Sequence, residues 1–327
     1  MPETKKWIEC YYGQSGTGKS ESISRLIERI FNETGLTARV AVGDGSAATY
    51  EGLADAGVCE IADYSIRDWP LSTLSQFCEG YWPVEPLDPK SKMVPMTQEQ
   101  LKKIGLYAFE GLSVGSLYIM GDKKGGFAQR SALGEKIGQD SPIQIVDLEK
   151  DKHGNVIPNS GPGTAFGGNP LAHYGVAQAR MRGLIEKSKA LPGWVIWTAH
   201  ERAAEDKVTN QKLIGPEVAG GAMTANLSRV FNNTLHFATV EKTRKEKDEH
   251  TDKQVDIVDA EYRIYTRDHF RPEGGTYVKY KAVCRTPDPA NMPLYLESSE
   301  PGASLIEFYE RIKKAREEQK ARLKGAA

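Results

Sequence analysis

The sequence has few cysteines and no long apolar run. Its four cysteines, Cys10, Cys59, Cys78 and Cys284, are widely separated and form no Cys-x-x-Cys pair. This spacing argues against a zinc site or a disulfide framework and favours reduced thiols. Neither an apolar stretch of 18 residues nor a signal-peptide core at the N-terminus is found, so we expect a cytoplasmic protein with no membrane contact.

The sequence also lacks an excess of charge. Lys and Arg total 43 and Asp and Glu total 44, which gives a net charge of −1. A near-neutral chain has no global basic field of the kind that marks many nucleic-acid-binding proteins. Any contact with DNA must therefore be local. Internal repeats of 20–50 residues are also missing, which argues against a solenoid.

A phosphate-binding pattern stands near the N-terminus. It matches G-x-x-x-x-G-K-[ST] at every position and consists of Gly13, Gln14, Ser15, Gly16, Thr17, Gly18, Lys19 and Ser20. Glycines let the backbone curl around a polyphosphate with its N–H groups turned inward, and the N-terminus of the following helix adds positive potential. In this pattern the lysine reaches the β- and γ-phosphates and the serine hydroxyl binds Mg²⁺. The pattern predicts ATP and Mg²⁺ as cofactors.

The flanking residues predict the strand, loop and helix order that this motif requires. Residues 7–12 are aromatic and β-prone, and apolar residues after Ser20 recur at helical spacing until a stop signal at Gly35. Further strands are predicted at 37–42 and 58–64, with a short helix at 47–56 between them. The alternation predicts an α/β fold with a mostly parallel sheet covered by helices on both faces.

The rest of the chain is less regular. Prolines make the region from Trp69 to Pro95 a predicted surface excursion, and residues 97–100 have the form of a capping box. The other predicted elements are strands at 104–110, 194–200 and 230–241, a small strand at 143–148, a helix around 177–185, a loop-like stretch at 203–226, a charged hairpin tip at 241–254, a strand pair formed by 262–265 and 277–283, and a helix at 304–324.

These elements suggest two regions. Residues 1–254 form the predicted ATPase core, with insertions at about 80–96 and 121–168, and residues 255–327 form a β-rich extension that ends in a charged helix. The length of the second insertion favours a functional loop.

Two acidic residues at predicted strand ends are candidates for hydrolysis. Glu110 ends the strand at 104–110, where an acid on an adjacent strand can hold the Mg²⁺ shell; the alternative is an ordinary carboxylate that caps the following helix. Asp44 follows the strand at 37–42 and is either the base that activates water or a turn-forming residue beside glycine. Glu110 is itself a second candidate for the base. Asp122 is the fallback acid.

His200 ends the strand at 194–200. A neutral imidazole there, or the hydroxyl of Thr198, could hydrogen-bond the γ-phosphate and report its loss. The alternative is a histidine with a structural role only.

Four segments carry a family resemblance: the motif at Gly13 to Ser20, the Tyr-Ala-Phe-Glu run that ends at Glu110, the Trp-Thr-Ala-His run that ends at His200, and the segment 220–237. Together they resemble the RecA-like P-loop ATPases of bacteriophages. The similarity is greatest to the short RecA-core type linked to single-strand annealing and recombination. It covers roughly residues 5–245, and it is strong at the phosphate loop and weaker elsewhere.

The resemblance implies a homo-oligomer, either a ring or a filament, and further functional residues. Lys242 and Arg244 take the place of the basic pair that reaches a neighbouring subunit's ATP; the alternative is that both belong to a solvated charged run. The resemblance also implies that residues 201–225 contact single-stranded DNA. This segment carries Arg202, Lys207 and Lys212 for phosphates, but it has no aromatic residue on which a base could stack.

The leading hypothesis is a Mg²⁺-dependent ATPase that acts on DNA in recombination, annealing, replication or packaging. The alternative is a nucleotide-binding virion-assembly or structural protein without motor activity. A small-molecule kinase fits less well, because the 121–168 insertion offers only Arg130 where such kinases carry an arginine-rich lid.

Overall fold

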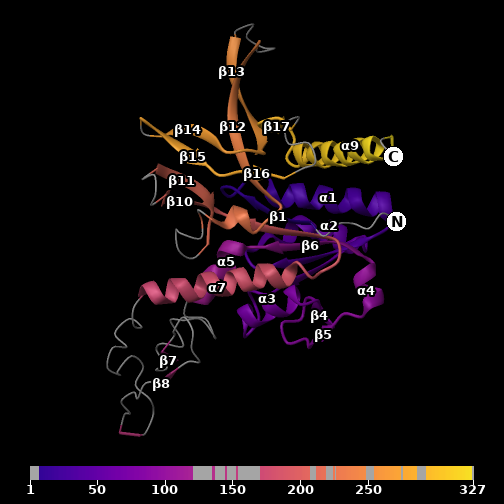
Figure 1. Cartoon of the computed structure of the whole chain (residues 1–327), viewed down its shortest axis with the longest axis vertical. Helices are drawn as coiled ribbons and strands as arrows, with labels where there is room; N and C mark the ends of the chain where they lie inside the picture. Colours follow the sequence, from indigo (N-terminus) through magenta and orange to yellow (C-terminus); the bar gives the residue numbers. More distant parts are fainter. Residues whose placement is uncertain are drawn as a thin grey trace.

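The computed structural model describes residues 7–120, 135–136, 144–145, 152–153, 170–206, 211–218, 224, 226–247, 254–273, 275–285 and 292–325. The fold is mixed α/β, with a large, mostly parallel central sheet and helices packed against it (Figure 1).

Six strands of the central sheet run parallel. They are β1 (Trp7–Tyr12), β2 (Thr37–Val42), β3 (Cys59–Asp63), β6 (Ile104–Glu110), β9 (Trp194–Ala199) and β12 (Asn233–Lys247), in the spatial order β12-β1-β9-β6-β2-β3. Three antiparallel strands extend the sheet beyond β12: β13 (Gln254–Tyr265), β16 (Val283–Cys284) and β17 (Tyr295–Ser298). The sheet is therefore mixed, and the strands predicted at 7–12, 37–42, 58–64 and 104–110 are confirmed.

One detail of strand order was predicted wrongly. Glu110 ends β6, and β6 does not neighbour β1, because β9 lies between them. β9 nevertheless pairs in parallel with both strands: its Thr198 is the register partner of Tyr11 in β1, and its Trp197 is the register partner of Phe109 in β6. The carboxyl ends of β1, β9, β6 and β2 consequently lie at one edge of the sheet, which is where ligands bind in open α/β sheets.

Helices cover both faces of the central sheet. One face packs against α1 (Lys19–Thr34), η1 (Ser46–Tyr50), α2 (Glu51–Asp55) and α9 (Ala303–Gly325), and the other packs against α3 (Pro70–Cys78), α5 (Leu112–Met120) and α7 (Pro170–Ser188). Alternate residues of β1 serve the two cores: Ile8 and Cys10 point to one, Trp7 and Tyr11 to the other. In Figure 1 the C-terminal helix α9 lies alongside α1.

A second sheet has four strands in the order β10-β11-β15-β14. They are β10 (Glu201–Asp206), β11 (Gln211–Pro216), β14 (His269–Glu273) and β15 (Thr276–Tyr280). Two sequence predictions were wrong here: residues 203–226 contain a hairpin rather than only a loop, and 277–283 does not pair with 262–265. The physical reason is long-range pairing, since β11 accepts β15 as a parallel neighbour and β13 pairs with β12 and β17 instead.

The region from Trp69 to Pro95 is more ordered than the sequence predicts. Pro70 opens α3, whose Leu74 and Phe77 are buried, and β4 (Tyr81–Pro83) pairs with β5 (Met93–Pro95). The capping box is confirmed, because Thr97 and Gln100 cap α4 (Gln98–Lys102) reciprocally.

In the insertion at 121–168 the structure describes two short paired strands, β7 (Glu135–Lys136) and β8 (Gln144–Ile145). The strand predicted at 143–148 lies partly outside the described residues. The fallback acid, Asp122, and Arg130 lie outside them altogether.

The residues after 255 join the central sheet and its core. Ile264 of β13, Leu296 of β17 and Phe308 of α9 are buried in the same cluster as Leu26 of α1. The predicted charged hairpin forms the distal half of β12 and β13, which extends away from the body of the molecule (Figure 1). Among the described residues, no helix has the length and apolar character needed to cross a membrane.

Candidate functional site

The phosphate loop connects β1 to α1 at the ligand-binding edge of the sheet. A side chain at Gly13 would place its Cβ 2.2 Å from the Phe237 carbonyl oxygen, so only glycine fits between β1 and β12. Gly18 has a φ of 80° and precedes α1 without any side-chain cap. A helix start without a side-chain cap leaves its backbone N–H groups available, which is the arrangement that binds an anion.

Lys19 lies in the hollow of this loop. Its Nζ donates to the carbonyl oxygens of Gly13 at 3.0 Å and Gln14 at 2.8 Å. Burial lowers the pKa of the Lys19 amine, while the negative charges of Glu110, Asp44 and Glu201 act in the opposite direction. Three carboxylates thus act electrostatically on the lysine of the motif.

Glu110 is almost fully buried at the end of β6, with 1% of its surface exposed. Thr198 Oγ1 donates to Glu110 Oε2 at 2.5 Å, and the Tyr50 hydroxyl donates to Oε1. Burial raises the pKa of the Glu110 carboxyl and the charge of Asp44 raises it further, whereas hydrogen bonds from Thr198, Tyr50 and Ser20 lower it. Glu110 and Ser20, the two predicted Mg²⁺ ligands, therefore interact at this end of β6.

Asp44 lies beside this pair on an exposed turn. Val42, two residues earlier, is the register partner of Glu110, and the main-chain N–H of Ser46 donates to Asp44 Oδ1 at 3.3 Å. Asp44 thus forms a turn with Ser46, and its role as a base stays a prediction. Its charge also acts on both Glu110 and Lys19, so the same residue lies within electrostatic range of the phosphate site.

Two oxygen-bearing side chains of this site could serve as ligands for Mg²⁺. Within the described ranges, no three His, Cys, Asp or Glu side chains form a metal-binding group. Mg²⁺ bound to a nucleotide usually takes one or two carboxylates, with phosphates and waters as its other ligands. The Ser20 hydroxyl and the Glu110 carboxylate match that set, since each Glu110 oxygen retains a lone pair beyond the hydrogen bond it accepts.

His200 is attached to this edge through its main chain. Its N–H donates to Ser113 Oγ at 2.8 Å, and its carbonyl accepts from Glu217 N at 2.7 Å. Thr198, two residues earlier, is the residue of this strand that contacts the carboxylate of the site. The sequence analysis named both positions, and the structure brings only the threonine side chain to Glu110.

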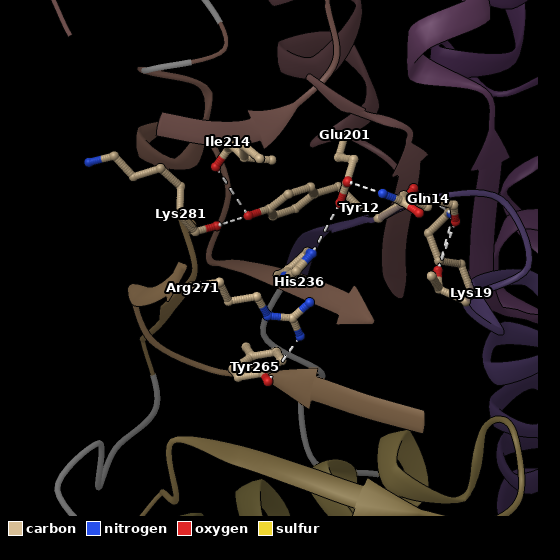
Figure 2. Close-up of polar contacts among 11 residues, drawn as sticks. Tyr12, Gln14, Lys19, Glu201, Ile214, His236, Tyr265, Arg271 and Lys281 are labelled. Atoms are coloured by element: carbon tan, nitrogen blue, oxygen red, sulfur yellow. Dashed lines mark hydrogen bonds and ion pairs between the residues drawn. The ribbon is translucent and has the colours of Figure 1, made fainter. Parts of the chain in front are cut away.

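Glu201 was missed by the sequence analysis. Its Oε1 accepts from Gln14 Nε2 of the phosphate loop at 2.7 Å, and its Oε2 lies 3.3 Å from His236 Nε2 (Figure 2). Burial raises the pKa of Glu201, but hydrogen bonds from His236 and Gln14 outweigh it and hold that pKa below its usual value. The only available signal was its position directly after a predicted strand.

Behind Glu201 lies a buried cluster of rings. His236 stacks on His269 and packs against the tilted rings of Tyr12 and Tyr280, with ring centroids 4.8–5.1 Å away. Arg271 Nη2 donates to the Tyr265 hydroxyl at 3.0 Å beside this cluster (Figure 2). The phosphate loop is therefore connected through Glu201 and His236 to β14 and β15 of the second sheet.

Lys242 and Arg244 lie away from the phosphate loop of their own chain. Both are on the extending hairpin, where Lys242 bonds Glu261 at 3.2 Å and Arg244 bonds Asp259 at 2.5 Å. His236 is the register partner of Tyr12, and a strand rises by about 3.3 Å per residue, so Lys242 lies about 20 Å further along β12. Neither side chain can reach the site in the same subunit.

The predicted DNA segment, 201–225, begins with β10 and β11. Arg202 is exposed on β10 and Lys212 on β11, while Lys207 lies outside the described residues.

Comparison of the chain with protein-family models and with curated proteins gives no match.

Proposed function

We propose that this chain is a Mg²⁺-dependent ATPase of the RecA-like type. The single observation that carries the proposal is the grouping of Lys19, Ser20 and Glu110 at one strand edge, with Thr198 and Asp44 beside them. A phosphate loop alone binds a nucleotide, whereas hydrolysis needs an acid near the metal and a base near the attacking water.

In the proposed reaction, Lys19 leaves the loop carbonyls and contacts the β- and γ-phosphates. Ser20 and Glu110 would hold Mg²⁺, which would supply positive charge to offset the negative charge on the phosphates. Asp44 accepts a proton from water as the water oxygen attacks the γ-phosphorus. The bond from that phosphorus to the β,γ-bridging oxygen breaks, which releases ADP and inorganic phosphate.

The roles of the two acids follow from their surroundings. Both oxygens of Glu110 are held by donors from Tyr50 and Thr198, and this fixed geometry suits a metal ligand. Asp44 is exposed, so water has access to its carboxylate. We therefore assign Mg²⁺ to Glu110 and the base to Asp44; the sequence leaves the base open between these two residues.

ATP turnover by the full chain, with and without single-stranded DNA, tests the proposal. Lys19→Ala should abolish turnover. Asp44→Asn should lower kcat by about 10²- to 10⁴-fold with ATP affinity retained, whereas Glu110→Gln should also raise the Mg²⁺ concentration needed for activity. Asp63→Asn is the matched control, because Asp63 forms the same kind of turn, with Ser65, at the end of β3. A lack of turnover in the wild-type chain under all conditions would favour the virion-assembly alternative.

A further inference from the structure

The second sheet has one packed side. Ile214, Val278 and Tyr280 are buried in the core cluster that also contains Trp197 and Phe109. On β11 the opposite side is also covered, because Leu213 is buried and Thr224 lies against Gly215. On β14 and β15, by contrast, the side opposite the core is an open part of the sheet.

Two aromatic residues are exposed on this open part. Phe270 of β14 is 53% exposed and Tyr277 of β15 is 71% exposed. The register pairs Phe270 with Lys279 and Pro272 with Tyr277, so all four side chains share one face. Diagonal neighbours across an antiparallel pair lie about 7–8 Å apart at Cα, within reach of two aromatic rings.

Positive charge accompanies the rings. The Lys279 amine lies 6.0 Å from the centre of the Phe270 ring. Asp268 forms ion pairs with both Lys279, at 2.8 Å, and Lys281, at 3.8 Å. One carboxylate therefore pairs with two lysines next to the exposed rings, in a chain that is close to neutral overall.

We propose that Phe270, Tyr277 and Lys279 form a platform for single-stranded nucleic acid. Unpaired bases have exposed π-faces that stack on aromatic side chains, and their phosphates pair with lysines. This platform supplies the aromatic contacts that residues 201–225 lack. It belongs to the same sheet as β10, whose first residue, Glu201, bonds the phosphate loop. Any coupling between this platform and ATP rests on the proposed function.

Fluorescence anisotropy of a labelled oligothymidylate, with the full-length chain at fixed low salt, tests the platform. Tyr277→Ala and Phe270→Ala should each raise Kd by about 5- to 150-fold. Tyr277→Phe should bind like the wild type, while Tyr277→Leu should bind like the alanine variant, because leucine keeps apolar area but has no π-face. Lys279→Ala should reduce the slope of log Kd against log salt by about 0.7.

The control is Val258→Ala, which removes an exposed apolar side chain from the distant hairpin. Equal Kd for wild type and both aromatic→Ala variants would overturn the platform. Full binding by Tyr277→Leu would also overturn it, since that result fits an apolar contact with a protein or a second copy. Equal competition by unlabelled duplex would contradict the single-strand preference.

The two proposals fail separately. Tyr277→Ala and Phe270→Ala should keep the Lys19-dependent turnover measured without DNA. A wild-type chain that hydrolyses ATP but does not bind the oligonucleotide would overturn the platform alone. A chain that binds it through Tyr277 but never hydrolyses ATP would overturn the proposed ATPase alone.

Discussion

The side-chain amide of Gln14 donates a 2.7 Å hydrogen bond to the carboxylate of Glu201. This bond joins the phosphate loop to the first residue of β10, and Glu201 also contacts His236 beneath the second sheet. A nucleotide that moves Gln14 or Lys19 must therefore change the surroundings of Glu201, whose charge acts on Lys19. The bond therefore links the proposed nucleotide site, through Glu201 and His236, to the sheet that carries the proposed platform.

Glu201→Ala should uncouple the two activities. Removal of the carboxylate breaks both hydrogen bonds, so we expect DNA to lose its stimulation of turnover while the oligothymidylate Kd stays unchanged. The measurement is the ratio of turnover with DNA to turnover without it. Glu205→Ala, on the same strand and the same side, is the control. Stimulation equal to that of the wild type would exclude Glu201 from the coupling.

Thr198→Val should weaken the proposed Mg²⁺ binding by Glu110, although the Glu110 side chain itself is unchanged. Thr198 Oγ1 donates to Glu110 and accepts from the Gly111 N–H at 3.0 Å. Loss of both bonds leaves buried polar groups without partners, at a cost of about 1–3 kcal/mol in the free energy of unfolding. We also expect a higher Mg²⁺ requirement, which a merely structural role would not produce. Thr198→Ser should restore both quantities, and a stability change without a shift in Mg²⁺ dependence would contradict the positioning role.

Arg244→Ala and Lys242→Ala should lower turnover while ATP affinity is kept, because both residues act on a neighbouring subunit's nucleotide in the proposed oligomer. An arginine that contributes in this way is worth about 10³-fold or more in kcat. Mixing Arg244→Ala with Lys19→Ala should restore part of the activity, since a mixed interface combines one intact loop with one intact arginine. Lys245→Ala, on the opposite side of β12, serves as the control. Equal loss of ATP affinity and turnover, or no recovery on mixing, would count against a trans role.

His269 should make stability depend on pH. Burial and the charge of His236 lower the pKa of His269 to about 3, whereas an unfolded histidine titrates near about 6.5. The unfolded chain thus binds the proton more tightly, so the stabilisation is fully present above about pH 6.5 and is lost as the pH falls from there towards 3. The loss at about pH 5 is about 1–2 kcal/mol.

His269→Phe should remove this contribution. Phenylalanine keeps the stacking on Tyr265, whose ring centroid is 3.6 Å away, and removes a buried Nε2 that has no hydrogen-bond partner within the described ranges. The free energy of unfolding, measured with urea, should therefore fall less between about pH 7 and 5 in this variant than in the wild type. His153→Gln, at an exposed position, is the control. An unchanged slope would refute the assignment.

Part of the candidate site could be predicted from the sequence. The phosphate loop, Glu110 and Asp44 follow strands that alternate with helices, and the carboxyl ends of parallel strands necessarily meet at one edge. The roles of Glu201, Tyr50 and His236 could not be predicted from the sequence, because their contacts depend on segments far apart in the chain. Gln14 and Glu201, for example, are separated by 187 positions.

The sequence alone determined the loop from Gly13 to Ser20, the helix that follows it and the strands of the parallel core. These features depend on local backbone preferences and on apolar periodicity over a few residues. Tertiary structure alone decided that β9 separates β1 from β6, that β11 pairs with β15, and that Phe270 and Tyr277 share an open face. Strand partners are selected by long-range packing and register, and these depend on residues distant in sequence.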